Sequence, residues 1–320
     1  MNNLSPVTKV LAIFALLIVC FFLIVQCIRS KPKPKGTEVT KTEPASVKPS
    51  SQESITIPTP QLPKNGVRRG VVEMGAKGFN FFIIEIDKSK NWKLINSGFG
   101  SSLVYERMAT EASILLALKE YISTMINFVD GKNIHFIVGS GARRDDRSLK
   151  IEEALKRLGY VVNIVTPEEE AIYAYKSAMP NEYMYKGFVV DIGSGNSKIA
   201  WLDIDETVHA ASTYGAKYYQ DSVSEHAVRY DVSNQTKKVP EARTSVCFII
   251  GGVPFEMADQ HRKDKERYTV LKAPSEYSVP GDLRFAAGKN IYQSIREQSG
   301  CETFVFDWDA NFSIGFLLDL

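Results

Sequence analysis

A strand–turn–strand sequence around Asp191 carries residue types that could hold a phosphate and a metal ion. Residues 187–202 read GFVVDIGSGNSKIAWL. The apolar run before Asp191 predicts a buried strand, and the Gly- and Ser-rich turn after it exposes backbone N–H groups that no Cβ obstructs. Such a concave set of donors suits a phosphate, and a carboxylate at the strand end can hold a divalent cation. Without a ligand, the same residues would form an ordinary glycine-rich β-hairpin.

A second sequence of the same form lies nearer the N-terminus. Residues 71–86 read VVEMGAKGFNFFIIEI, again a strand, a glycine turn and a strand. Two such hairpins in one chain indicate a duplicated architecture with a ligand between the halves.

The elements that must position these turns alternate between strands and helices. Apolar runs predict further strands at 91–98, 134–138, 161–165, 245–250 and 303–306. Helical periodicity predicts a helix at 105–128. Helices are also expected at 148–158, 215–228 and 283–298, with a final turn at 312–320. Thr166 and Pro167, followed by three glutamates, predict another helix start with Thr166 as its N-cap. The class is therefore α/β.

The composition is that of a globular protein of one or two domains. The chain has 320 residues, of which 44% are hydrophobic and 24% are charged. The net charge is +2, but the first 65 residues hold eight Lys/Arg against three Asp/Glu, so the remainder is mildly acidic. No basic stripe argues for nucleic acid. The four cysteines form no CxxC or Cys/His cluster, so a thiolate metal site is not expected.

The first 65 residues divide into three parts. Residues 1–9 are a polar tail, and residues 10–28 are uncharged and long enough to span a bilayer, which predicts a retained transmembrane anchor. A cleaved signal peptide is the alternative, although no A-x-A site follows, and a lipoprotein signal would end at Cys27. Residues 29–65 form a Pro/Lys/Ser/Thr linker that we expect to be disordered.

Two features of these residues disagree about the side of the membrane. The four basic residues just after the span outnumber the positive charges before it, which favours a cytoplasmic domain. Pro-rich linkers of this kind also tether domains on the periplasmic side. The side of the membrane on which the domain lies therefore stays open, with a slight preference for the cytoplasmic side that the charge bias favours.

Residues 68–320 resemble the exopolyphosphatase and guanosine pentaphosphate phosphatase (Ppx/GppA) family of the actin-like ATPase superfamily. Seven segments carry the resemblance in the family's order: VVEMGAKGFNFFIIEI, IVGSGARRD, VVNIVTPEEEAIYAY, VVDIGSGNSKIAWL, STYGAKY, CFIIGGVPFEMA and FSIGFLLDL. The resemblance implies an actin-like (ribonuclease H-like) duplicated two-lobe fold, with one lobe at 66–195 and the other at 196–320. The two glycine turns would then face each other across a cleft.

The resemblance also implies a Mg²⁺-assisted phosphatase that hydrolyses a phosphoanhydride, either polyphosphate or a guanosine pentaphosphate-type substrate. Glu169 is the expected general base, with Glu170 as the alternative if the register slips by one, and Arg144 would offset phosphate charge. Asp191 and Glu73 would hold the metal. The phosphates would lie in two loops made of Gly75, Ala76, Lys77, Gly78, Gly193, Ser194, Gly195, Asn196 and Ser197.

Several residues depart from the family pattern. Glu73 replaces the family's Asp, Ala76-Lys77-Gly78 replaces Ser-Asn-Ser, and Lys198 replaces a Glu after the second loop. The alternative is therefore a catalytically impaired actin-like protein that binds nucleotide or polyphosphate, or acts as a membrane-tethered scaffold. The expected partners are a phosphate-rich small molecule or polyphosphate and the membrane through residues 10–28, but not nucleic acid; a homodimer is left open.

Overall fold

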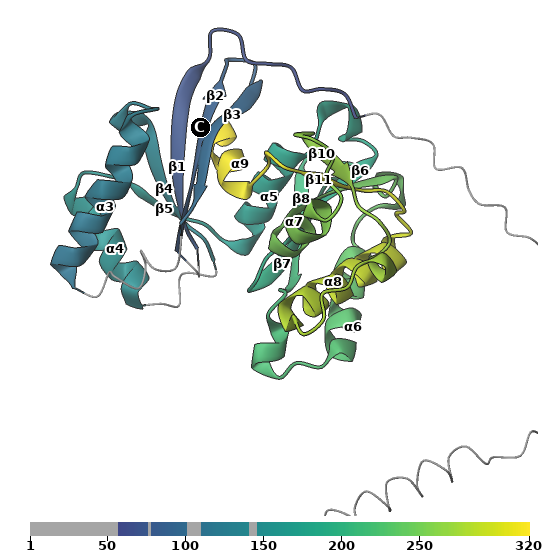
Figure 1. The fold of residues 1–320 in the computed structure, drawn as a ribbon. Coiled ribbons are helices and arrows are strands. Elements are labelled where there is room, and N and C mark those ends of the chain that lie inside the picture. The colour runs from purple at the N-terminus through teal and green to yellow at the C-terminus, as the bar shows by residue number, and fades with distance from the viewer. Residues whose placement is uncertain (1–56, 76–77, 101–109, 141–145) are drawn as a thin grey trace, which may run out of the picture. The chain divides into compact units, whose positions relative to one another are not determined.

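Two mixed β-sheets organise the part of the chain that the computed structural model describes, which is residues 57–75, 78–100, 110–140 and 146–320 (Figure 1). These residues belong to one compact unit. The predicted anchor at 10–28 and most of the linker lie outside the described residues. Within the described ranges, no helix is long and apolar enough to cross a membrane.

The first sheet has the strand order β3-β2-β1-β4-β5. Its strands are β1 (Val67–Gly75), β2 (Gly78–Ile86), β3 (Trp92–Phe99), β4 (Ile134–Val138) and β5 (Val162–Ile164). The first three form an antiparallel meander, and β4 and β5 add in parallel. Helices α3 (Glu111–Ile126) and α4 (Asp146–Arg157) cover one face and share a buried apolar core with β1, β2 and β4.

The second sheet repeats this arrangement and adds one strand, in the order β10-β11-β9-β6-β7-β8. Its strands are β6 (Gly187–Ile192), β7 (Asn196–Leu202), β8 (Val208–Tyr214), β9 (Val246–Gly251), β10 (Tyr268–Val270) and β11 (Phe304–Asp307). Again three antiparallel strands are followed by two parallel ones. Helices α6 (Glu225–Thr236), α7 (Gly252–Asp259) and α8 (Leu283–Ser299) pack on the outer face. The repeated strand order confirms the duplicated two-lobe α/β fold.

Two helices lie between the sheets (Figure 1). Helix α5 (Pro167–Ala178) packs on β6, β7 and β8, while α9 (Phe312–Asp319) packs on β1 and β2, and the two helices pack on each other. Arg69 of β1 donates to the carbonyl of Leu317 at 3.0 Å. At the crossing, a Cβ on Gly315 would overlap the carbonyl oxygen of Tyr173 in α5, so the close approach of the helices requires glycine there.

Most elements agree with the sequence predictions, and the exceptions have local causes. The predicted helix at 215–228 is wrong, because a 3₁₀ turn at Tyr218–Asp221 ends at Ser222 in a left-handed conformation and α6 begins only after its N-cap Ser224. Helix α9 replaces the predicted final turn: residues 312–318 are all buried, so their sequence shows no polar face. Strands β8 and β10 and helix α7 were not predicted.

The predicted lobe boundary after residue 195 falls inside the β6–β7 turn, and both of these strands belong to the second sheet. In the described chain, the first sheet ends with β5 and the second begins with β6. Four further 3₁₀ turns occur among the described residues, at Gly131–Asn133, Asn181–Tyr183, Glu241–Arg243 and Pro274–Glu276.

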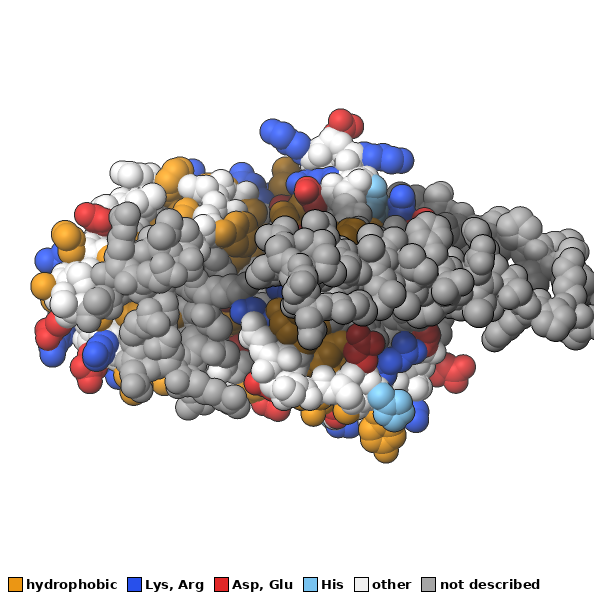
Figure 2. Space-filling view, turned by 60° about the horizontal axis from the view of Figure 1, so that its bottom comes forward, with side chains coloured by type: hydrophobic (Ala, Val, Ile, Leu, Met, Phe, Trp, Pro, Cys, Tyr) orange, Lys and Arg blue, Asp and Glu red, His pale blue; other side chains and the backbone are white. Residues whose placement is uncertain are grey.

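The described surface carries both signs of charge. On the face shown in Figure 2, Lys and Arg side chains are interspersed with Asp and Glu side chains. On this face, the coloured side chains form no broad field of one sign that would attract a ligand with many negative charges.

We predict that replacing Gly315 with alanine destabilises the protein by about 1–3 kcal/mol, because overpacking a tight crossing displaces α5 from α9. Gly131→Ala is the control, since its Cβ would meet only the Tyr160 hydroxyl at 3.7 Å. Urea denaturation of residues 56–320 measures both changes. Equal effects of the two substitutions would contradict the packing argument.

Candidate functional site

Four charged side chains from both sheets and α5 converge at the N-terminal end of that helix. Glu170 lies in the first turn of α5, Asp191 and Lys198 lie on β6 and β7, and Glu73 lies on β1. Asp191 is the cross-strand partner of Lys198 in the antiparallel β6–β7 pair. Cross-strand partners project from the same face of a sheet, and here that face is the one covered by α5.

Lys198 connects the two carboxylates. Its Nζ lies 2.7 Å from Glu170 Oε2 and 3.4 Å from Asp191 Oδ2. The three side chains are almost buried, at 7%, 3% and 10% exposure for Lys198, Glu170 and Asp191. Burial opposes the charge on Lys198, but Asp191 and Glu170 outweigh it and raise the pKa of the ammonium above its usual value. Lys198 is therefore a permanent cation at this site.

The second oxygen of Glu170 binds the end of the first sheet. The backbone N–H of Ser140 donates to Glu170 Oε1 at 2.5 Å. The adjacent Gly139 leaves room for this carboxylate, because a Cβ there would lie only 3.2 Å from the same oxygen. Asn196 Nδ2 in turn lies 3.4 Å from Ser140 Oγ. The end of β4 and the β6–β7 turn thus meet at Glu170.

Glu73 occupies a less charged position in the same cluster. Its Oε2 accepts a hydrogen bond of 3.1 Å from the hydroxyl of Ser313 in α9. Burial raises the pKa of Glu73 to about 7, and the neighbouring Glu170 adds to this, while the hydrogen bond from Ser313 acts in the opposite direction. Glu73 is therefore partly protonated at neutral pH.

The second glycine turn is held in shape by the residues after β8. The carbonyls of Gly193 and Ser194 accept from the backbone N–H groups of Ala216 and Lys217 at 2.9 and 3.0 Å. A Cβ on Gly193 would lie 2.6 Å from the Asn196 carbonyl. The turn predicted to bind phosphate, Gly193 to Asn196, is thus preformed at the edge of the charged cluster.

Ser197 lies on the other face of β7. Successive residues of a strand project to opposite faces, so Ser197 points away from Lys198. Ser197 is fully buried, and its Oγ has no hydrogen-bond partner among the described residues. In the second predicted loop, the side chain of Ser197 is therefore directed away from the cluster.

Glu169, the expected base, does not join the cluster. Its Oε2 accepts from the backbone N–H of Thr166 at 2.7 Å, and Thr166 Oγ1 accepts from the backbone N–H of Glu169 at 3.2 Å. This is a capping box, which uses the glutamate to close the helix start. Consecutive helical residues point about 100° apart, so Glu170 faces the site while Glu169 is exposed.

The first glycine turn is only partly described. Gly75 and Gly78 pair with each other at the ends of β1 and β2, two residues beyond Glu73 and Asn80. Ala76, Lys77 and Arg144, which were expected to bind phosphate, lie outside the described residues.

The residues present do not form a site for the implied Mg²⁺. Mg²⁺ requires several oxygen ligands at about 2.1 Å. Here the Asp191 carboxylate faces the Lys198 ammonium, and the Glu73 carboxyl is bound to Ser313. In the described ranges, no group of three or more His, Cys, Asp or Glu side chains is arranged to hold a metal ion. The expected metal ligands Asp191 and Glu73 are thus close to the site but engaged otherwise.

Comparison with known proteins gives the fold a name. No protein-family model matches the chain, and no curated protein matches it in sequence. A type II variant structure of the Aquifex aeolicus Ppx/GppA phosphatase matches with a TM-score of 0.59 at 18% identity, over 79% of this chain and 99% of that one. An exopolyphosphatase from Cytophaga hutchinsonii matches with a TM-score of 0.58 at 14% identity, over 79% and 98%.

The chain has the Ppx/GppA fold. A second structure of the Aquifex aeolicus family member gives the same TM-score of 0.59 at 19% identity, over 79% of this chain and 97% of that one. The resemblance found in the sequence is therefore confirmed at the level of the fold. Identities this low leave the activity of this Ppx/GppA-like chain to be argued from its own residues.

Sequence reasoning missed three residues that shape the candidate site: Gly139, Ser140 as a donor to Glu170, and Ser313. Ser313 lies 240 residues from Glu73 in sequence, so no local pattern connects them. Lys198 was noted only as a departure from the family pattern. Its position opposite an aspartate in a predicted hairpin was the one available signal for an ion pair.

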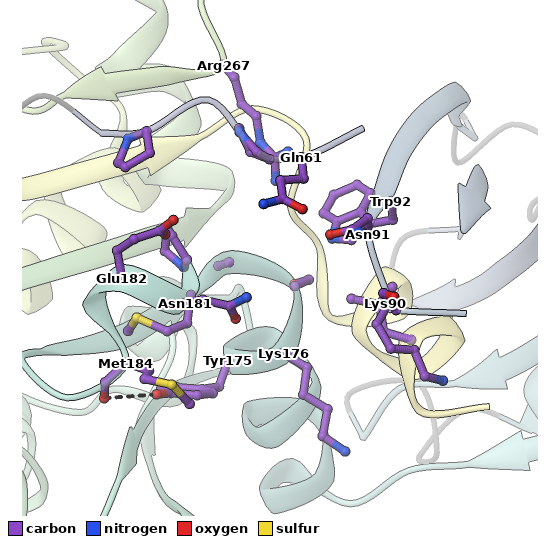
Figure 3. Close-up of a pocket in the computed structure, with 18 of the residues that line it drawn as sticks. Gln61, Lys90, Asn91, Trp92, Tyr175, Lys176, Asn181, Glu182, Met184 and Arg267 are labelled. Carbon is purple, nitrogen blue, oxygen red and sulfur yellow. Dashed lines mark hydrogen bonds between the residues drawn. The ribbon is translucent and has the colours of Figure 1, made fainter. Parts of the chain in front are cut away.

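A separate cavity of about 460 Å³ lies at the other end of α5 (Figure 3). It is lined by residues 58–61, 89–92, 175–182 and 267–268, among others, and by none of the predicted site residues. Two of its lining cations are paired: Arg267 binds both oxygens of Asp307 and lies 4.7 Å from the centre of the Trp92 ring, and Lys176 pairs with Asp319. Lys90 is a third lining cation. We therefore place the candidate site at Glu170 and not in this cavity.

Glu73 should make stability depend on pH. Because its pKa is raised from the usual 4.5 to about 7, the folded chain holds a proton that the unfolded chain releases between these values. Stability that is present at low pH is then lost as pH rises through about 7. We expect the free energy of unfolding of the wild type to fall relative to Glu73→Gln between about pH 5 and pH 7.5.

Urea denaturation of both proteins across this pH range measures the difference. The other titrating groups are the same in the two proteins, so their contributions cancel in the difference between the two free energies of unfolding. A difference that stays constant with pH would show that Glu73 is ionised throughout.

Proposed function

We propose that the protein is a Ppx/GppA-type phosphatase that hydrolyses a phosphoanhydride, of polyphosphate or of a guanosine pentaphosphate-type nucleotide, with Glu170 as its general base. The observation that carries this proposal is the position of Glu170. Its carboxylate is fixed by Ser140 and Lys198 at the junction of the two sheets, beside the preformed turn at 193–196. The Ppx/GppA fold supports it but does not by itself define the reaction.

The chemistry of the residues fits this reaction. A carboxylate such as that of Glu170, which contacts Lys198, can take a proton from a water molecule. The oxygen of that water would attack the terminal phosphorus while the bond to the bridging oxygen breaks. Backbone N–H groups of the glycine turn and the positive end of α5 would stabilise the charge of the phosphate.

One observation favours a second candidate, a catalytically impaired protein that binds a nucleotide or polyphosphate, or serves as a scaffold. Both oxygens of Glu170 are engaged, one by Ser140 and one by Lys198, and the residue is only 2% exposed. A base must reach the water that it activates. Catalysis therefore requires that ligand binding opens space beside Glu170, whereas a binding protein would keep the pair closed.

The two glutamates at the start of α5 allow a matched test of the base. We expect Glu170→Gln to lower phosphate release by about 10²–10⁴-fold, which is the usual contribution of a general base. Glu169→Gln should leave the rate near that of the wild type, because glutamine can still accept from Thr166. Inorganic phosphate released from polyphosphate and from guanosine pentaphosphate is the readout.

If both variants keep the wild-type rate, Glu170 is not the base. If the wild type releases no phosphate but tripolyphosphate raises its melting temperature, the binding function is supported instead.

We also propose that residues 10–28 anchor the protein in a membrane. Their uncharged apolar sequence supports this, and the side on which the folded unit lies is left open by the charge bias and the linker. The full chain should stay in the membrane pellet after a carbonate wash, and a chain lacking residues 1–28 should move to the supernatant. Release of both chains would contradict the anchor.

A further inference from the structure

The ammonium of Lys198 is enclosed on several sides. Glu170 and Asp191 contact it, and the centre of the Phe312 ring in α9 lies 5.8 Å away. Gly193 is also close, because a Cβ added to it would lie 3.5 Å from Lys198 Nζ. Glu73 also interacts with it electrostatically, and with Glu170. The cation is thus surrounded by carboxyl groups from β1, α5 and β6, and the turn after β6 closes beside it.

The buried carboxylates around Lys198 need a cation beside them. Glu170 and Asp191 are both almost buried, and a buried carboxylate without a counter-charge is strongly destabilising. Carboxylate oxygens from separate elements are also the ligands that Mg²⁺ and Mn²⁺ prefer. The same group of side chains would therefore attract a divalent ion if Lys198 were absent.

A divalent ion and the ammonium cannot occupy this position together. Lys198 Nζ lies 2.7 Å from Glu170 Oε2 and 3.4 Å from Asp191 Oδ2. An ion bound to these two oxygens at about 2.1 Å would lie in the space that Nζ fills. The flexible arm of Lys198 reaches this point from the neighbouring strand, so the cation is attached covalently to the site.

We infer that Lys198 is a built-in cation that takes the place of a divalent metal ion between Glu170 and Asp191. We expect removal of its side chain to open a Mn²⁺ or Mg²⁺ site formed by the carboxylates of Glu170 and Asp191. The inference concerns the cation and not the reaction, so it does not depend on whether the chain hydrolyses phosphate.

Binding of Mn²⁺ to the full-length protein in detergent tests this, with free Mn²⁺ read by its electron paramagnetic resonance signal. We expect the wild type to show no saturable site at the cluster. Lys198→Ala should bind one Mn²⁺ per chain at least about tenfold more tightly than the wild type does. In this variant the carboxylates of Glu170 and Asp191 no longer contact the lysine ammonium and are free to bind the ion. The ion should also raise the melting temperature of this variant and not that of the wild type.

Two controls locate the gained site. Lys176→Ala removes a lysine that pairs with Asp319 at the far end of α5, so it should gain no Mn²⁺. Lys198→Ala combined with Glu170→Gln should lose the gained binding. Gain in both lysine variants, or retention in the double variant, would overturn the inference.

Further outcomes are also decisive. A wild-type Mn²⁺ site that Glu170→Gln or Asp191→Asn removes would show that the metal coexists with Lys198 and would overturn the inference. A folded Lys198→Ala chain that binds no more Mn²⁺ than the wild type would do the same. If this variant is unfolded without metal, Mn²⁺ should restore its circular dichroism spectrum, and failure to do so overturns the inference.

Discussion

The contact on which this site depends is the ammonium of Lys198 between the carboxylates of Glu170 and Asp191. Buried charges are tolerated only where they are paired and hydrogen-bonded. Here the pairing also joins separate parts of the chain: Lys198 fixes α5 to the second sheet, and Glu170 extends the connection through Ser140 to the first sheet. Loss of the cation would leave two carboxylates of like charge facing each other at the junction of the sheets.

The duplicated sheets explain why the charges meet at this place. Each sheet contributes a glycine hairpin with an acidic residue near the end of its first strand, Glu73 in one and Asp191 in the other. Helices α5 and α9 fill the space between the sheets and bring Glu170 and Ser313 to those strand ends. The chain shares its fold with the Ppx/GppA phosphatase structure that it matches, and in this chain a lysine lies between the two carboxylates.

Local sequence patterns predicted the framework well. Both glycine hairpins and the N-cap at Thr166 are set by neighbouring residues, and the structure confirms them. The resemblance placed the base at Glu169, with Glu170 as the alternative one residue further on. Only the contacts of Glu170 with Ser140 and Lys198, and the capping contact of Glu169 with Thr166, distinguish the two. Helix α9 escaped prediction because burial on all sides removes the periodic polar face on which such predictions depend.

The direct measurement of the central contact is a double-mutant cycle on the free energy of unfolding, with Lys198→Met and Glu170→Gln made singly and together. Methionine keeps most of the lysine volume and removes its charge. We predict a favourable coupling between Lys198 and Glu170 of more than about 1 kcal/mol, so that the double variant is more stable than the two single effects predict. Additive effects of the two substitutions would show that the Lys198–Glu170 pair does not hold the site together.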